Sequence, residues 1–323
     1  MRTSQRILLL AIVALLSLPA LAQLNDTYVI PASGNVPGQF GTRWMTQFSI
    51  MNPHLDYSLK VSITYLPTGG GTGIEELVTL PPNSVAYSDN LLGDLFERSG
   101  SGSLLVATFP EDNPGVPNTV LARAFLVTSN TYNNSSSGTY GQTIPGVWAG
   151  LLDVDTDGIT AVAHGIRNLA REGWRTNIGA VNLGRCSATV HVTVYDADGR
   201  RLLNAAPFVV PPLGHMQDRL PVEVDMGAVE LWVQDPCVND NARYAVVFPY
   251  TSTIDQLSGD PTYQSPALLA LPGTLFAKSK ASVDSTALGK KIDTDFARAV
   301  RAQAERRGEA TLVRNGARWQ ISK

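Results

Sequence analysis

Short stretches of the chain alternate between apolar and polar residues. Two clear apolar rows, each interleaved with polar or small residues, are Leu59, Val61, Ile63 and Val190, Val192, Val194. Clusters of Gly, Pro, Asn and Asp separate such stretches. Side chains of a β-strand point alternately to opposite faces, so this pattern predicts strands with one buried face. Residues 23–273 contain no persuasive helical period, and the sequence predicts an all-β fold.

The first half of the chain recurs in the second half. Trp44-Met45-Thr46 matches Trp174-Arg175-Thr176, Asn52 matches Asn182, and Pro81-Pro82 matches Pro211-Pro212, each 130 residues later. In the strand between these matches, an offset of 130 would pair the apolar row beginning at Leu59 with polar residues. A one-residue slip exchanges the two faces of a strand. An offset of 131, which pairs Leu59 with Val190, is therefore preferred there.

These observations predict two tandem antiparallel immunoglobulin-like β-sandwiches, over residues 23–150 and 151–273. Residues 274–323 differ: a small polar linker leads to a helix over Ile292–Arg307 and to a hairpin at Asn315-Gly316, a dipeptide typical of tight hairpins. A helix and one hairpin are too small to be stable alone. We expect this tail to pack on a sandwich or to bind a partner. The apolar candidates for its anchoring are Phe296, Val300, Leu312, Trp319 and Ile321.

Charge is unevenly distributed along the chain. Residues 274–323 carry 11 Lys and Arg against 5 Asp and Glu, whereas residues 23–273 carry 12 against 23. An acidic body repels phosphate, which argues against a nucleic-acid partner. The basic tail is predicted to fold back on the acidic body or to engage an acidic partner.

The N-terminus has the pattern of an export signal. Arg2 and Arg6 flank the start of an apolar run that ends at Leu18, and Ala20-Leu21-Ala22 supplies the small residues of a cleavage site. The run is shorter than the roughly 20 residues that cross a bilayer. We therefore expect residues 1–22 to be removed, leaving no transmembrane anchor, and the protein to be secreted, extracellular or periplasmic.

The segment from Val29-Ile30-Pro31 through Gly38, Gly41-Thr42 and Trp44-x-Thr46 to Asn52 resembles secreted bacterial tandem β-sandwich repeat proteins of uncharacterised function. The resemblance extends over residues 28–270, with the second copy keeping the Trp-x-Thr and Asn positions. It implies export and an extracellular binding or structural role, and it brings no catalytic residues to this chain.

One acidic stretch has the spacing of a calcium loop. Asp153, Asp155, Asp157 and Gly158 occupy its first, third, fifth and sixth positions. His164 stands at the twelfth position, where a glutamate is expected, and no helices flank the stretch. Two interpretations stay open: a calcium site, which is the one cofactor candidate in the sequence, or an acidic turn between the copies.

Cys186 and Cys237 are the two cysteines of the chain, both in the second copy. An even number of cysteines in an exported chain favours a disulfide. A zinc-binding or catalytic role would need further ligands at suitable spacing, and the sequence offers none.

Candidate ligand-binding residues are aromatic. Tyr132 and Tyr140 belong to a polar, turn-forming stretch, and such loops on a rigid sandwich recognise ligands in many proteins. Trp232 alternates with the apolar residues Leu231 and Val233, so it should face away from the core. The alternatives are a solvated hairpin tip and a tryptophan covered by another part of the chain.

The motifs of common enzymes, among them HExxH, GxSxG and the P-loop, do not occur in the chain. The sequence therefore favours a non-catalytic extracellular adhesion, scaffold or ligand-binding protein, with an extracellular protein or a glycan as its partner. The alternative is a secreted hydrolase or its carbohydrate-binding accessory module, and whether the protein is an enzyme is left open. Three or more acidic and histidine side chains in one cleft would favour a hydrolase.

Overall fold

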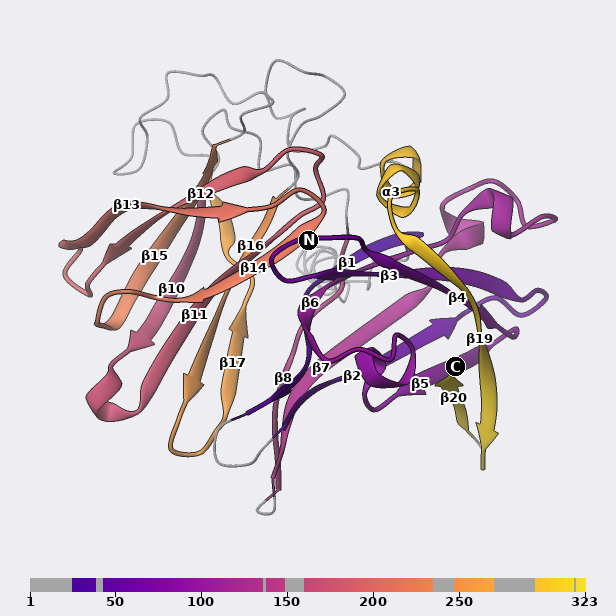
Figure 1. Cartoon of the computed structure of the whole chain (residues 1–323), viewed down its shortest axis with the longest axis horizontal. Helices are drawn as coiled ribbons and strands as arrows, with labels where there is room; N and C mark the ends of the chain where they lie inside the picture. The colour runs from indigo at the N-terminus through magenta and orange to yellow at the C-terminus, as the bar shows by residue number, and fades with distance from the viewer. Residues whose placement is uncertain are drawn as a thin grey trace, which may run out of the picture.

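A computed structural model describes residues 25–38, 43–135, 138–148, 160–234, 247–269, 294–316 and 318–323. The described residues form mainly β-strands with a few short helices, in two domains that lie side by side (Figure 1). The all-β prediction is confirmed. The predicted export signal, residues 1–22, lies outside the described residues. No helix in the described part of the chain is long and apolar enough to span a membrane.

The second copy consists of two antiparallel sheets. The five-stranded sheet has the order β13 (Arg201–Val210), β12 (Ala188–Tyr195), β15 (Val224–Gln234), β10 (Thr160–Asn168), β18 (Ala267–Leu269). The four-stranded sheet has the order β14 (Gly214–Arg219), β11 (Trp174–Asn182), β16 (Val247–Asp255), β17 (Pro261–Gln264). Both sheets contribute to one core of small aliphatic residues, such as Val192, Leu231 and Ala180.

The first copy repeats this strand order. One run of strands is β4 (Ile74–Leu80), β3 (Leu59–Pro67), β6 (Gly100–Ala107), β1 (Thr27–Pro37), β9 (Val147–Trp148). The other is β5 (Ser84–Ser88), β2 (Arg43–Asn52), β7 (Leu126–Ser135), β8 (Gly138–Thr143). Each strand has its counterpart in the second copy. The one-turn helix α2 (Leu91–Asp94), capped by the Asn90 side chain, adds two leucines to the core.

The tail hairpin changes the architecture of the first copy. Strands β19 (Glu305–Asn315) and β20 (Arg318–Ser322) lie between β4 and β5, β19 parallel to β4 and β20 parallel to β5. Together with the pairing of β1 and β2, they close an eight-stranded mixed barrel. The expectation of an antiparallel sandwich is therefore corrected for the first copy. The tail supplies backbone hydrogen bonds to two strands that would otherwise be open edges.

The tail itself is partly as predicted. Helix α3 (Thr294–Arg301) is shorter than the expected helix, and the chain is already a strand at Gly308, whose φ of 140° suits glycine. The hairpin at Asn315-Gly316 is confirmed. Of the predicted anchors, Val300 and Ile321 are buried, and Leu312 and Trp319 pack partly buried against the barrel core. The side chain of Phe296 lies outside the described residues.

Ion pairs join the basic tail to the acidic barrel. The buried Glu75 carboxylate contacts Arg301 Nε at 2.5 Å and Arg306 Nε at 2.9 Å. Arg301 is itself buried, contacts Asp112, and lies over the Phe109 ring at 4.4 Å. Because these contacts are removed from water, they are stronger than surface pairs once formed. The tail therefore folds back on the acidic body.

Charge explains why the tail closes the first copy rather than the second. The buried Glu76 accepts a hydrogen bond from Lys323 Nζ at 2.6 Å, beside the Glu75 cluster. The strand registers place Ala205 and Ala206 at the equivalent positions of β13. The second copy thus lacks the two carboxylates that receive the tail, and its edge strands β13 and β14 have no partner hairpin among the described residues.

Strand registers also correct the alignment of the two copies. Ile63 lies opposite Val106, and Val192 lies opposite the equivalent Leu231. Ile63 therefore corresponds to Val192 at an offset of 129, not 131. A two-residue change keeps every side chain on its face. The predicted buried rows of both strands are accordingly confirmed.

The repeated asparagines have the same structural role in both copies. Asn52 Nδ2 donates to the carbonyl of Leu80, and Asn182 Nδ2 donates to that of Val210. Each Oδ1 accepts the backbone N–H two residues further on. Both asparagines are fully buried. The repeated asparagine therefore links the end of one strand to the end of another, which is a structural role.

The two domains share an apolar interface. Val29 and Leu105, on the outer face of the barrel, pack with Val181 and Phe248 of the sandwich, and α3 adds Val300. The tail helix thus belongs to the apolar cluster that the two domains share. Burial of apolar area between them stabilises their arrangement by about 25 cal/mol per Å².

A chain of hydrogen-bonded polar side chains, with His215 and Tyr250 buried at its centre, crosses the same interface. Thr68 Oγ1 bonds to His215 Nδ1 at 2.7 Å, His215 Nε2 bonds to Tyr250 Oη at 2.7 Å, and Tyr250 donates to Gln217 at 2.8 Å. A Cβ at Gly179 would lie 2.2 Å from the Tyr250 ring, so glycine makes room for it. Burial lowers the pKa of His215 to about 3, so its imidazole is neutral.

Candidate functional site

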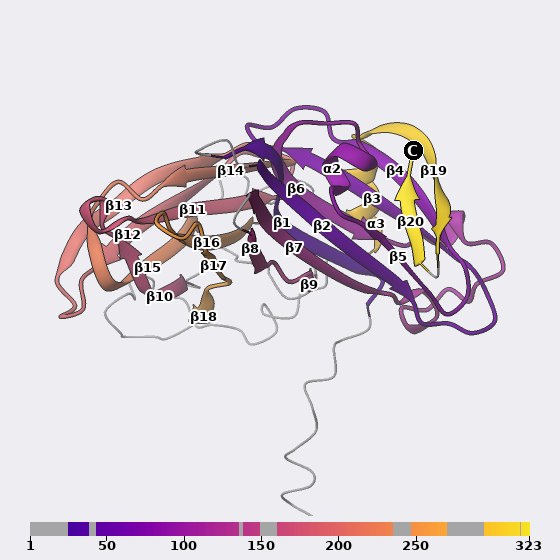
Figure 2. The same ribbon diagram turned by 90° about the horizontal axis from the view of Figure 1, so that it is seen from below.

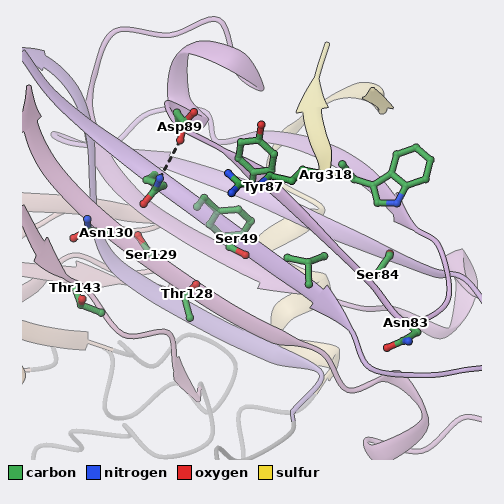
Figure 3. Close-up of a pocket in the computed structure, with 14 residues that line it drawn as sticks. Ser49, Asn83, Ser84, Tyr87, Asp89, Thr128, Ser129, Asn130, Thr143 and Arg318 are labelled. Carbon is green, nitrogen blue, oxygen red and sulfur yellow. Dashed lines mark hydrogen bonds between the residues drawn. The ribbon is translucent and has the colours of Figure 1, made fainter. Parts of the chain in front are cut away.

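A groove crosses the outer face of the barrel, with a cavity volume of about 870 Å³ (Figure 3). Strands β8, β7, β2, β5 and β20 all contribute to it. Its lining is mainly polar and includes Gln47, Ser49, Asn83, Tyr87, Asp89, Thr128, Asn130, Thr143 and Arg318. The groove thus combines residues from both ends of the chain.

Strand register aligns the polar side chains in two rows. Residues directly opposite each other in neighbouring strands project on the same face of a sheet. One row crosses β8, β7 and β2 and consists of Thr143, Asn130 and Gln47. The other row crosses β7, β2 and β5 and consists of Thr128, Ser49 and Tyr87. Phe48 and Ile50 alternate with these polar residues along β2 and point into the barrel core. The core therefore fixes the strand that carries the centre of the groove.

Asp89 is held at one end of the groove. Its Oδ1 accepts a hydrogen bond from Gln47 Nε2 at 2.9 Å, drawn in Figure 3, and its backbone carbonyl accepts one from Tyr132 Oη at 3.1 Å. Burial, with Asp89 and Asp94 nearby, raises the pKa of Tyr132, so the phenol stays a donor. Among the described lining residues, Asp89 is the one carboxylate.

The tail completes the groove. Trp319 lies opposite Ala86 of β5, and the exposed Arg318 lies next to Tyr87 (Figure 3). The guanidinium of Arg314 lies over the Trp319 ring at 5.3 Å. Amide, hydroxyl, carboxylate and guanidinium groups therefore face one concave surface, where they can donate and accept hydrogen bonds.

The predicted ligand-binding tyrosines are separated. Tyr132 lies opposite Gly141 at the edge of the groove, whereas Tyr140 lies opposite Asn133 on the other face of the β7–β8 hairpin. The polar stretch that contains both forms the two strands of this hairpin rather than a loop.

Trp232 lies in the other domain. It is partly exposed while Leu231 and Val233 are buried, so its predicted outward direction is confirmed. Its ring stacks on His191, with centroids 3.9 Å apart and planes 9° from parallel. His191 Nε2 bonds to Gln234 at 3.0 Å. The structure does not bring Trp232 together with Tyr132 or Tyr140, and ligand binding by these three stays a prediction.

The two remaining sequence predictions concern residues outside the described part. Asp153, Asp155 and Asp157 all lie there, and so does Cys237, the predicted partner of Cys186. The calcium site and the disulfide therefore stay predictions. The residues that the structure describes contain no cluster of three or more His, Cys, Asp or Glu side chains suited to a metal ion.

Sequence reasoning did not identify the groove, because its polar residues occupy ordinary outward positions of strands. Their one shared signal is the crowding of Gln, Ser, Thr and Asn on β2 and β7. Comparisons with protein-family models, curated proteins and solved structures gave no significant match. The function is therefore inferred from the chemistry of the groove.

Proposed function

We propose that the protein is an exported, non-catalytic binding protein whose outer groove binds a glycan. The observation that carries this proposal is the pair of polar rows across the groove. A sugar presents hydroxyl donors and acceptors at short intervals, and side chains such as Gln47, Asn130 and Asp89 can match them in both roles. The ring of Tyr87 adds amphipathic surface that suits the apolar face of a sugar.

The rigidity of the site supports binding. Its side chains stand on strands whose inward residues are fixed in the core, so little ordering is needed when a ligand arrives. The two facing antiparallel sheets of the second copy support its interpretation as an immunoglobulin-like sandwich. Such a domain can act as a spacer or as a second adhesive unit, and its fold alone does not assign a function.

The hydrolase alternative has less support in this groove. Most glycosidases use two carboxylates, about 5 to 10 Å apart, one of them as the general acid. The described groove offers Asp89, whose carboxylate is engaged by Gln47. Glu75, Glu111 and Asp112 do converge elsewhere, but they contact Arg301 and other basic residues of the tail.

A glycan array probed with the chain lacking residues 1–22, followed by calorimetry on the best ligand, tests the proposal. Gln47→Ala and Asn130→Ala should each weaken binding about 3- to 10-fold, as expected for one lost hydrogen bond. Asn204→Ala, on the exposed β13 of the other domain, is the matched control and should bind like the parent protein. Absence of glycan binding, or equal affinity in all three variants, would refute the proposal.

A further inference from the structure

A second crevice lies between the two domains, with a volume of about 350 Å³. The barrel contributes β1, β2, β7 and β8, and the sandwich contributes β11, β14 and β16, which meet near the centre of the molecule (Figure 2). Its polar lining residues include Ser33, Thr131, Gln142, Arg175, Asn177, Gln217 and Ser252, and its apolar ones include Ala32, Val36, Trp44, Ile144 and Ile254.

The walls of this crevice are held in place. Gln142 of the barrel and Ser252 of the sandwich exchange hydrogen bonds of 3.1 and 3.2 Å across the interface. On β11, Arg175 and Asn177 share the barrel-facing side with Val181, which belongs to the apolar interface. The crevice is therefore a preformed cavity at a domain interface, where small-molecule sites are common.

Its charge is positive and unbalanced. Arg175 Nε is buried and has no hydrogen-bond partner among the described residues. No Asp or Glu occurs among the described residues that line the crevice, although the body of the protein is acidic. Arg219 lies opposite Asn177 on the neighbouring strand, and it adds to burial in lowering the pKa of Arg175.

A buried N–H without a hydrogen-bond partner, such as that of Arg175 Nε, costs stability unless a ligand satisfies it. An arginine in a partly dry cavity binds a carboxylate well, because its planar guanidinium offers parallel N–H donors. We propose that the crevice binds a small carboxylate-bearing molecule, with the carboxylate on Arg175 and its remaining part against Trp44 and Val36. This site is independent of the glycan proposed for the outer groove.

Calorimetry with four probes tests the proposal on the chain lacking residues 1–22. The probes are benzoate and galacturonate, which carry a carboxylate on an aromatic or a sugar ring, and their neutral counterparts benzyl alcohol and galactose. At least one acid should bind, and its neutral counterpart should bind at least about 10-fold more weakly. Which acid binds distinguishes an aromatic from a sugar acid. No detectable binding of either acid at millimolar concentration would overturn the proposal.

Variants distinguish a ligand-binding arginine from a structural one. Arg175→Gln should weaken acid binding at least about 10-fold and leave the ligand-free melting temperature unchanged or higher, because the buried Nε–H without a hydrogen-bond partner is removed. Asn177→Asp places a carboxylate beside Arg175 and should also abolish acid binding. Arg200→Gln, an exposed arginine of the same domain, should bind normally. Unchanged binding in Arg175→Gln, or a lower melting temperature, would overturn the proposal.

Discussion

Truncation of Ile321 to alanine tests whether the tail hairpin is a structural part of the barrel. Ile321 is 0% exposed in the barrel core. Removing a fully buried isoleucine side chain costs about 2–5 kcal/mol. With a urea dependence of about 2 kcal/mol per M, the unfolding midpoint of the barrel should fall by about 1–2.5 M. The same substitution would have almost no effect if the tail were detached from the barrel.

Val313→Ala is the matched control, since Val313 is on the same hairpin and 51% exposed. Its cost should stay below about 0.5 kcal/mol. Urea unfolding followed by circular dichroism gives both midpoints. If Ile321→Ala unfolds at the same urea concentration as Val313→Ala, the hairpin does not occupy the barrel core in solution, and the closed barrel is refuted.

Three further predictions concern the interface, the tail and the cysteines. The folded-state pKa of His215, about 3, lies below its ordinary 6.5, so the unfolded chain binds more protons between these values and stability falls as pH is lowered through this range. The unfolding free energy should fall by about 2 kcal/mol between pH 7 and pH 5, and His215→Gln should remove this fall. If the slope of unfolding free energy against pH is the same in His215→Gln as in the parent protein, the prediction is wrong. Glu75→Gln, which removes the buried carboxylate that contacts Arg301 Nε, should cost about 3 kcal/mol, and adding Arg301→Met should restore part of this loss. Additive costs in this double-mutant cycle would show that the pair is not coupled. Mass spectrometry of non-reduced peptides should find Cys186 linked to Cys237, and two free thiols would exclude the disulfide.

Much of the fold could be predicted from local pattern. Alternation placed Val61 and Val192 in buried rows, and Asn315-Gly316 marked a hairpin, because both signals act over a few neighbouring residues. Net charge indicated that the tail either folds back on the acidic body or engages an acidic partner, and the ion pairs of Glu75 correspond to the first alternative. These features need no knowledge of which distant strands pair.

The closed barrel could not be predicted in the same way. Ala310 pairs with Val78, more than 200 residues away in the sequence. The residues of a strand do not by themselves indicate which distant strand will pair with it. The groove was missed for the same reason. Asn130, Gln47 and Arg318 come from separate strands, and only the register and the insertion of β20 bring them to one surface.

The insertion of the tail also fixes the order in which the protein can be completed. A ribosome makes the N-terminal domain first, and such domains generally fold as soon as they emerge. Here the first domain lacks two of its eight barrel strands until Ser322 has been added, after the whole sandwich has been made. Its closure depends on contacts far apart in sequence, which form slowly. In a chain that must cross a membrane, as the N-terminal signal predicts, such a delay would keep the leading domain open during translocation. Insertion of β19 and β20 would then close the barrel only after the other six strands and the second domain have been made.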